Sequence, residues 1–230
     1  MNANLQIGPL VLRIQWLVII LSIFIGNLMI RYRLKRFADL EDSIKDQIIV
    51  SIEESAVIAI LTWKFSVVLF DPIRIVTSPL AILYYSGGER GIGLALVVVL
   101  VYFYYHSKKE HIPIGVYGDL LAAGFLIGMV AYSVIALWLN QQRAWIYGSE
   151  ILLALLLYQL YFRNSKGTAR LNNLNQALTW FSLGQVFVSF ISPWRQNFWW
   201  GFSQLQIVFL ILAAFCIMID FFTAKNSLIK

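Results

Sequence analysis

Long apolar runs, separated by short polar connections, make up most of this 230-residue chain. A helix needs about 20 apolar residues to cross a hydrocarbon core about 30 Å thick. In lipid, a helix also satisfies its own backbone hydrogen bonds. We therefore predict an all-α membrane bundle of about seven transmembrane helices, over Pro9 to Ile30, Ile48 to Phe70, Gly91 to Tyr105, Ile112 to Leu139, Ala144 to Phe162, Leu174 to Ser192 and Phe202 to Phe222.

Three of these runs need comment. The third is short unless residues 79–86 dip into the membrane ahead of it, and the fourth contains Gly115 and Gly118, where we expect a break. The first run contains Arg13 and has no small-residue cleavage site after it. We interpret it as a retained anchor rather than a signal peptide.

The composition agrees with a lipid environment. Apolar residues make up 60% of the chain and charged residues 13%, whereas soluble domains average about 25% charged residues. No soluble segment or internal repeat remains once the apolar runs are removed. We therefore predict one integral membrane domain over residues 1–230 and look for function within or beside the bilayer.

Basic residues predict the orientation, because Lys and Arg accumulate in short cytoplasmic loops. With the N-terminus outside, the outer connections hold Arg74, Arg90, Arg143 and Arg195. The inner connections then hold a larger group: Arg31, Arg33, Lys35, Arg36, Lys45, Lys108, Lys109, Arg163, Lys166, Arg170, Lys225 and Lys230. This bias predicts an N-out, C-in topology, and it explains the net charge of +6 without nucleic-acid binding.

Cysteine usage limits the chemistry. Cys216 is the one cysteine, so a disulfide or a cysteine-based metal site within one chain is excluded, and we expect this residue to serve in packing. We expect no metal and no cofactor.

Charged residues inside apolar runs are the main functional candidates, because they are costly in lipid. Glu53 and Lys64 are eleven residues apart and share one face of the second run, while Asp119 and Glu150 lie early in the fourth and fifth. Each is either a functional group or a residue near the membrane interface. A stripe of hydroxyl residues also follows the second run, which favours a central helix: Ser51, Ser55, Thr62 and Ser66.

Glycines mark two further features. Gly87, Gly88, Glu89 and Arg90 open the third run, where backbone N–H groups at a helix start favour an anionic headgroup and Arg90 adds a positive charge. The alternative is a tight turn with a solvated ion pair. In the fourth run, Gly124 and a glycine four residues later predict a helix-packing surface.

Short motifs succeed one another along nearly the whole chain: Ile7-Gly8-Pro9-Leu10, Ser78-Pro79-Leu80 ahead of Gly87-Gly88, Asp119-Leu120-Leu121-Ala122, Phe181-Ser182-Leu183-Gly184 and Gly201-Phe202-Ser203-Gln204. In this order they resemble prolipoprotein diacylglyceryl transferase, the bacterial membrane enzyme that moves a diacylglyceryl group from phosphatidylglycerol to a lipoprotein cysteine. The resemblance implies seven helices, an N-terminus outside and a location in the bacterial plasma membrane.

The residues that carry catalysis in that family are mostly absent. Glu89-Arg90-Gly91 stands where the family has a His-Gly-Gly, and residues 128–133 lack the arginine and asparagine of its Gly-Arg-Ile-Gly-Asn-Phe signature. Lys64, in place of an arginine, and Glu150, in place of the glutamate of a Tyr-Glu, remain. The transfer needs cations for the phosphate and a group that ionises the thiol, and losing one such stabiliser typically costs about 10²- to 10³-fold.

Three functions remain open. The first is a non-catalytic or strongly divergent member of the family that binds phospholipid, a lipoprotein signal segment or another membrane protein at the outer face. Its headgroup-binding candidates are Lys64, Gly87, Gly88, Arg90, Arg143 and Arg195. The second is an active transferase with Glu89 or Glu150 as the base. The third is a small transporter or channel that uses Glu53, Lys64 and Asp119.

Overall fold

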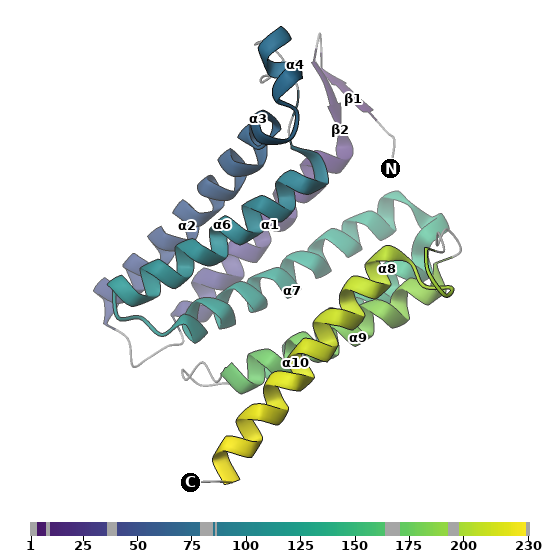
Figure 1. Cartoon of the computed structure of the whole chain (residues 1–230). Helices are drawn as coiled ribbons and strands as arrows, with labels where there is room; N and C mark the ends of the chain where they lie inside the picture. Colours follow the sequence, from purple (N-terminus) through teal and green to yellow (C-terminus); the bar gives the residue numbers. More distant parts are fainter. Residues whose placement is uncertain are drawn as a thin grey trace. The chain divides into compact units, whose positions relative to one another are not determined.

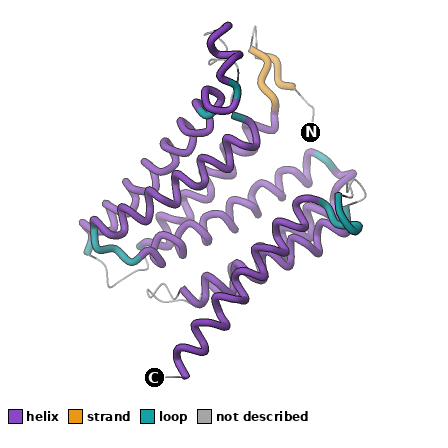
Figure 2. Tube along the Cα trace, in the orientation of Figure 1, coloured by secondary structure: helices purple, strands orange, loops and turns teal. Residues whose placement is uncertain are grey.

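The computed structural model of the chain describes residues 4–7, 10–35, 41–78, 85, 87–163, 171–192 and 198–228. Most of these residues form long helices with short connections between them (Figures 1 and 2). Two four-residue strands, β1 (Asn4–Ile7) and β2 (Leu10–Arg13), pair antiparallel ahead of the first helix. Apart from this pair of strands, the predicted helical class is confirmed.

A helix occupies part or all of every apolar run predicted from the sequence. The long helices are α1 (Ile14–Leu34), α2 (Asp42–Phe65), α6 (Gly88–Lys109), α7 (Ile114–Leu139), α8 (Ala144–Leu157), α9 (Leu171–Ile191) and α10 (Gln204–Leu228). Four shorter pieces flank them: α3 (Val67–Phe70), α4 (Pro72–Thr77), the 3₁₀ helix η1 (Gln141–Arg143) and the π-helix η2 (Tyr158–Phe162).

Five of the described helical segments are long and apolar enough to cross a membrane. They are α1, α6, α7, the continuous segment of η1, α8 and η2, and α10. Among the other long helices, α2 carries Glu53, Glu54 and Lys64 within its apolar run, and α9 carries several amide and hydroxyl side chains. The structure therefore supports five spans by length and composition, and seven remains a prediction.

Two predicted boundaries are corrected. The break expected at Gly115 and Gly118 is wrong, because α7 runs unbroken through both positions. A Cβ added at Gly118 would lie 2.6 Å from Leu174 Cδ2, so this glycine makes room for a neighbouring helix. The first helix begins at Ile14 rather than Pro9, because the preceding residues pair as strand β2. The expected dip over residues 79–86 lies largely outside the described residues.

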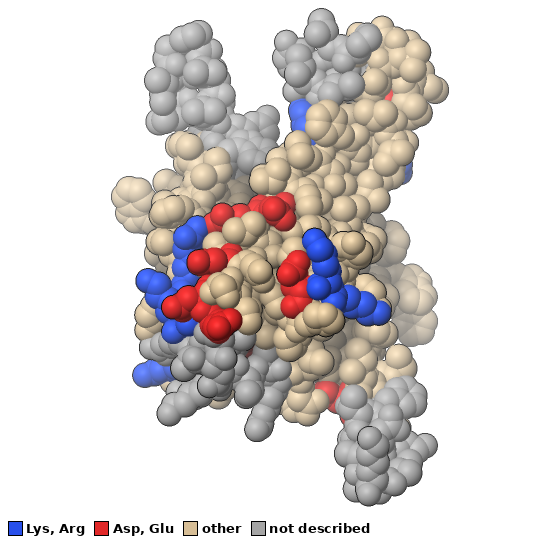
Figure 3. All heavy atoms as spheres, turned by 90° about the vertical axis from the view of Figure 1, so that its left-hand side faces the viewer, with Lys and Arg blue, Asp and Glu red and all other residues tan. Residues whose placement is uncertain are grey.

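The contacts divide the chain into two compact units: residues 1–37 with 118–230, and residues 38–117. We call them the terminal unit and the inserted unit. In the inserted unit α2 and α6 pack against each other in opposite directions, and Ser51, Ser55 and Ser66 of the predicted polar stripe are buried. Charged side chains gather on the face that Figure 3 shows. In the inserted unit, Lys45 and Asp42 near the start of α2 form an ion pair.

In the terminal unit, glycines bring α1 and α7 together. A Cβ added at Gly26 would lie 2.7 Å from the carbonyl oxygen of Gly124, and one added at Gly128 would lie 3.1 Å from the carbonyl oxygen of Ser22. Such close backbone approach is typical of small residues spaced four apart in membrane helices. The predicted packing role of Gly124 and Gly128 is confirmed.

The rest of the terminal unit packs around α8 and α9. Buried apolar side chains of α7, α8, η2 and α9 form one cluster, which includes Leu126, Leu157 and Phe162 and three alanines. Helix α9 also packs along α10. This packing holds α7 and α8 side by side, and polar groups lie at the two ends of that helix pair.

Candidate functional site

One polar contact lies near the connection between α7 and α8. The chain turns through Asn140 and η1, and Glu150 comes about two helical turns after the start of α8. Ser133 of α7, which has no exposed surface, donates a hydrogen bond from its hydroxyl to Oε2 of Glu150 at 2.8 Å. The carboxylate of Glu150, for which the sequence also allowed a position near the membrane interface, is therefore half-buried between two apolar helices.

Three more polar side chains belong to the same α7–α8 connection. Tyr147 of α8 is buried, and Tyr132 of α7 is half-buried directly before Ser133. Arg143 is exposed at the end of η1, seven residues before Glu150 and directly before the first residue of α8. We call Tyr132, Ser133, Arg143, Tyr147 and Glu150 the hairpin cluster. It combines one cation, one carboxylate and three hydroxyl groups.

The glycine turn at the start of α6 has a clear packing role. The backbone nitrogen of Gly87 donates a hydrogen bond to the carbonyl oxygen of Trp63 at 3.1 Å. A Cβ added at Gly87 would lie 1.8 Å from Ser66 Oγ, and one added at Gly91 would lie 2.3 Å from the same atom. These glycines let α6 begin directly against the end of α2. The amide of Gly87 is thus already bonded within the protein.

The other predicted residues of this turn face outward. Gly88 has a φ of 57°, in the left-handed region that favours glycine, and no atom lies within 4 Å of a Cβ added there. Glu89 and Arg90 are exposed in the first turn of α6, where the acidic side chain suits the helix dipole. Lys64 is half-buried in the last turn of α2. The inserted unit thus brings the glycine turn against the end of the helix that carries Lys64.

The candidates therefore fall into separate groups. Lys64, the glycine turn and Arg90 belong to the inserted unit, whereas Arg143 and Glu150 belong to the terminal unit. Arg195 lies outside the described residues. Within the terminal unit, Arg143 and Glu150 share the hairpin cluster.

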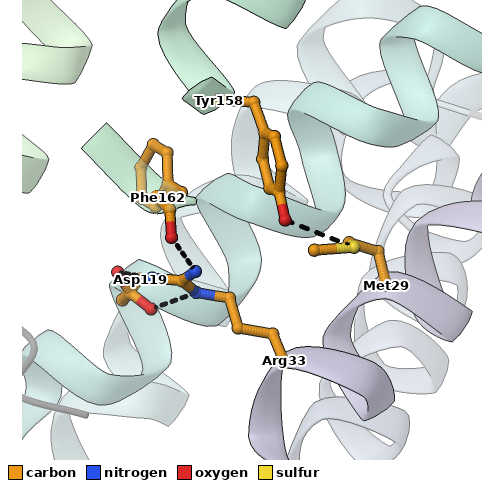
Figure 4. A network of polar contacts seen from close by, with 5 residues as sticks. All are labelled: Met29, Arg33, Asp119, Tyr158 and Phe162. Atoms are coloured by element: carbon orange, nitrogen blue, oxygen red, sulfur yellow. Dashed lines mark hydrogen bonds and ion pairs between the residues drawn. The ribbon is translucent and has the colours of Figure 1, made fainter. Parts of the chain in front are cut away.

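A second polar centre of the terminal unit was missed by the sequence reasoning. Arg33 of α1 forms an ion pair with Asp119 of α7, with Nε 2.6 Å from Oδ2 and Nη2 2.9 Å from Oδ1. Its Nη1 also donates a hydrogen bond to the carbonyl oxygen of Phe162, the last residue of η2 (Figure 4). The side chains of Arg33 and Asp119 are only 4% and 11% exposed. We call this arrangement the Arg33 clamp.

The clamp corrects the placement of Arg33 and gives Asp119 a partner. Arg33 was assigned to an inner loop as a topogenic charge, but it lies inside α1 and is buried. Asp119 was a candidate for transport or other chemistry, but both of its oxygens are bonded to Arg33. The signal that points to a partner is the charge itself, because a carboxylate in an apolar helix needs a cation. Sequence spacing alone does not say which cation that is.

A third polar contact joins α9 and α10. The amide nitrogen of Asn175 donates hydrogen bonds to the carbonyl oxygen of Cys216 at 2.8 Å and to Oδ1 of Asp220 at 2.6 Å. Cys216 is buried, as its expected packing role requires. Among the described residues, no three His, Cys, Asp or Glu side chains gather as metal ligands would. This contact therefore ties two helices together.

The fold defines a multi-pass helical membrane protein. Comparison with known proteins adds no narrower assignment. No family model matches the chain, and no curated protein matches it.

Proposed function

We propose that this protein is a non-catalytic binder of anionic phospholipid in the bacterial plasma membrane, with the hairpin cluster as its headgroup site. In this proposal the chain crosses the membrane seven times with its N-terminus outside. The connection between α7 and α8 then lies at the outer face, because the chain leaves the cytoplasmic side in α7. Phosphatidylglycerol is the ligand that the resemblance to prolipoprotein diacylglyceryl transferase implies.

The observation that carries the proposal is the position of Glu150. A carboxylate is costly inside an apolar helix and is usually retained for a functional reason. Among the described residues, Ser133 is the one that donates a hydrogen bond to this side chain, and it occupies a single oxygen, Oε2. The carboxylate can therefore accept further hydrogen bonds from a ligand.

The chemistry of the cluster suits a headgroup with both a phosphate and hydroxyl groups. Arg143 supplies a guanidinium, which pairs well with phosphate oxygens. Glu150 accepts hydrogen bonds from hydroxyls, such as those of a terminal glycerol. The two residues are seven positions apart in the chain, Arg143 at the end of η1 and Glu150 within α8. Phosphatidylglycerol presents both kinds of group.

The composition of this helix pair argues against transfer chemistry. Between residues 118 and 162 Arg143 is the single Lys or Arg. Displacing glycerol phosphate develops negative charge that such enzymes stabilise with preorganised positive groups. One exposed arginine supports binding better than it supports catalysis. We therefore place the protein with accessory or regulatory functions in envelope or lipoprotein biology, in contact with a lipoprotein signal segment or another membrane protein.

Lipid affinity tests the proposal directly. Purified protein in nanodiscs, titrated with phosphatidylglycerol and, separately, with phosphatidylcholine, is expected to prefer the first lipid. A charge-assisted hydrogen bond is worth about 1.5–3 kcal/mol, so Arg143→Gln is expected to weaken phosphatidylglycerol binding about tenfold or more. Arg163→Gln is the matched control, because Arg163 is exposed just beyond the other end of the same helical segment. Equal affinity for both lipids, or equal loss in both variants, contradicts the proposal.

Transfer is tested in the same preparation. Labelled phosphatidylglycerol and a lipobox peptide are incubated with the protein, and the peptide is analysed for a diacylglyceryl adduct. We expect no adduct. An adduct that disappears in Glu150→Gln would establish the alternative, an active transferase with Glu150 as base.

A further inference from the structure

The Arg33 clamp joins three helices at one end of the terminal unit. Arg33 lies near the end of α1, Asp119 near the start of α7 and the Phe162 carbonyl at the end of η2. Figure 4 shows the guanidinium between the carboxylate and the carbonyl, with Tyr158 and Met29 alongside. The guanidinium also lies 5.4 Å from the centre of the Phe162 ring. Charge, hydrogen bonding and ring contact thus converge on one side chain.

The electrostatics of the clamp are favourable at every contact. The last carbonyl groups of a helix have no partner within the helix and carry partial negative charge, so a cation is favoured there. Asp119, in the second turn of α7, supplies a full negative charge to the same guanidinium. Arg33 therefore links the negative end of the α8–η2 segment to a carboxylate of α7.

The π-helix contributes to this geometry. The backbone nitrogen of Arg163 bonds the carbonyl oxygen of Tyr158, five residues earlier, as π-helical turns require. One extra residue in a turn rotates the residues after it by about 100° relative to an α-helix. The direction of the last carbonyl of η2, and hence its contact with Arg33, depends on this turn.

The clamp and the hairpin cluster lie at opposite ends of the same two helices. Ser133 is fourteen residues beyond Asp119 in α7, and Glu150 is twelve residues before Phe162 in the α8–η2 segment. Both intervals correspond to about 20 Å along a helix. A shift of α8 along α7 at the clamp is therefore expected to move Glu150 away from Ser133 as well, because the backbone hydrogen bonds of a helix resist a change in its length.

We infer that the Arg33 clamp is a positioning device that sets the axial register of α8 against α7 and so maintains the Ser133–Glu150 contact at the far end. Arg33 is a positioning residue in this account, acting through α8 rather than on a ligand. The inference deepens the proposed function, since it concerns the same cluster. The register itself can be measured without lipid.

A crosslinking experiment in detergent reads the register. Cys216→Ala removes the native thiol, and Ser133→Cys with Glu150→Cys places two thiols at the contact. A short bis-thiosulfonate reagent then links them at a rate that depends on their separation. Arg33→Met and Asp119→Asn, each added to this background, are expected to slow the crosslink at least fivefold. Arg33→Lys retains a cation for Asp119 and is expected to recover most of the rate.

Arg31→Met is the matched control, since Arg31 is an exposed arginine on the same helix, and it is expected to leave the rate unchanged. Asp119→Asn preserves the shape of the side chain, so it reports on the register even where Arg33→Met fails to fold. A rate that stays constant in Asp119→Asn, while the melting temperature falls, would show a clamp with only local effect and would overturn the inference.

Phosphatidylglycerol binding, measured with Ser133 and Glu150 intact, separates the two claims. Arg33→Met is expected to weaken binding about fivefold, and Arg33→Lys is expected to restore most of it. If the unmodified protein binds no phosphatidylglycerol, the proposed function fails, while the crosslinking rates still decide the inference about register.

Discussion

The two units of the chain hold their helices together in different ways. In the terminal unit a buried ion pair joins α1, α7 and η2, with side chains 4% and 11% exposed. In the inserted unit Gly87 and Gly91 bring α6 against Ser66 and Trp63 of the α2 end, and the ion pairs Lys45–Asp42 and Lys109–Glu110 lie at the surface. Close glycine contacts also join α1 and α7 in the terminal unit. The terminal unit should therefore be sensitive to lost charge as well as to added volume, and the inserted unit mainly to added volume.

The physical reason is the cost of desolvation. Two charges removed from water interact strongly, but either one left alone is far more costly than the pair. Surface ion pairs contribute little, because water already solvates both partners. Glycine contacts carry no such charge term and respond to the size of the replacement side chain.

The largest loss of stability is expected when the ion pair of the Arg33 clamp is broken. Arg33→Met leaves Asp119 buried without its cation and is expected to destabilise the terminal unit by about 3–5 kcal/mol. Replacing both partners, with Arg33→Met and Asp119→Leu, is expected to be less damaging than Arg33→Met alone. Thermal unfolding in detergent, followed by tryptophan fluorescence, measures both. A double variant that loses the sum of two single losses would contradict the account.

A smaller effect is expected in the inserted unit when volume is added. Gly91→Ala places a methyl group 2.3 Å from Ser66 Oγ and is expected to cost about 1–3 kcal/mol by overpacking. Adding Ser66→Ala removes that oxygen and should restore most of the stability. Gly93→Ala is the matched control, because no atom lies within 4 Å of a Cβ added there. Equal losses at Gly91 and Gly93 would rule out the close contact.

A loss of about 1 kcal/mol is expected at the start of α10. Ser203 Oγ accepts a hydrogen bond from the backbone nitrogen of Gln206, whose side chain accepts one from the backbone nitrogen of Ser203. This reciprocal pair is a capping box, and replacing a capping serine by alanine costs about 1 kcal/mol. Ser203→Ala should lower the melting temperature, whereas Ser203→Asp should retain most of the stability. Identical melting temperatures for all three proteins would exclude the cap.

The smallest loss of stability is expected when a surface ion pair of the inserted unit is removed. Asp42→Asn removes the partner of Lys45, and exposed pairs of this kind are worth about 0–1 kcal/mol. We expect a change in melting temperature close to the measurement error, and a smaller one still at high salt. A loss as large as that of Arg33→Met would remove the distinction between the two units.

Hydropathy was enough to predict where the helices lie, because each apolar run contains one. It placed their ends less well. The inserted unit shows why: α2 begins at Asp42 rather than Ile48, since charged residues continue a helix beyond its apolar part. Glycine patterns were ambiguous, because they are typical both of helix packing and of anion binding. Gly124 and Gly128 pack helices as predicted, but Gly87, which suggested an anion site, also packs helices.

The sequence could not identify the partners of the buried charged side chains. Asp119 and Glu150 were identified as candidates because charge in an apolar run is costly. Their partners, Arg33 and Ser133, are 86 and 17 residues away in the sequence and meet them only in the folded chain. Such pairings depend on helix register, which hydropathy does not encode.

The most direct test of the central claim is to map where phosphatidylglycerol binds. A photoactivatable phosphatidylglycerol with a diazirine in its headgroup is irradiated with the protein in nanodiscs, and the adducts are located by mass spectrometry. We predict adducts concentrated between Tyr132 and Glu150, reduced by Arg143→Gln and absent with a matched phosphatidylcholine probe. Adducts spread over the exposed apolar helix faces, or equal for both lipids, would contradict a headgroup site at the hairpin cluster.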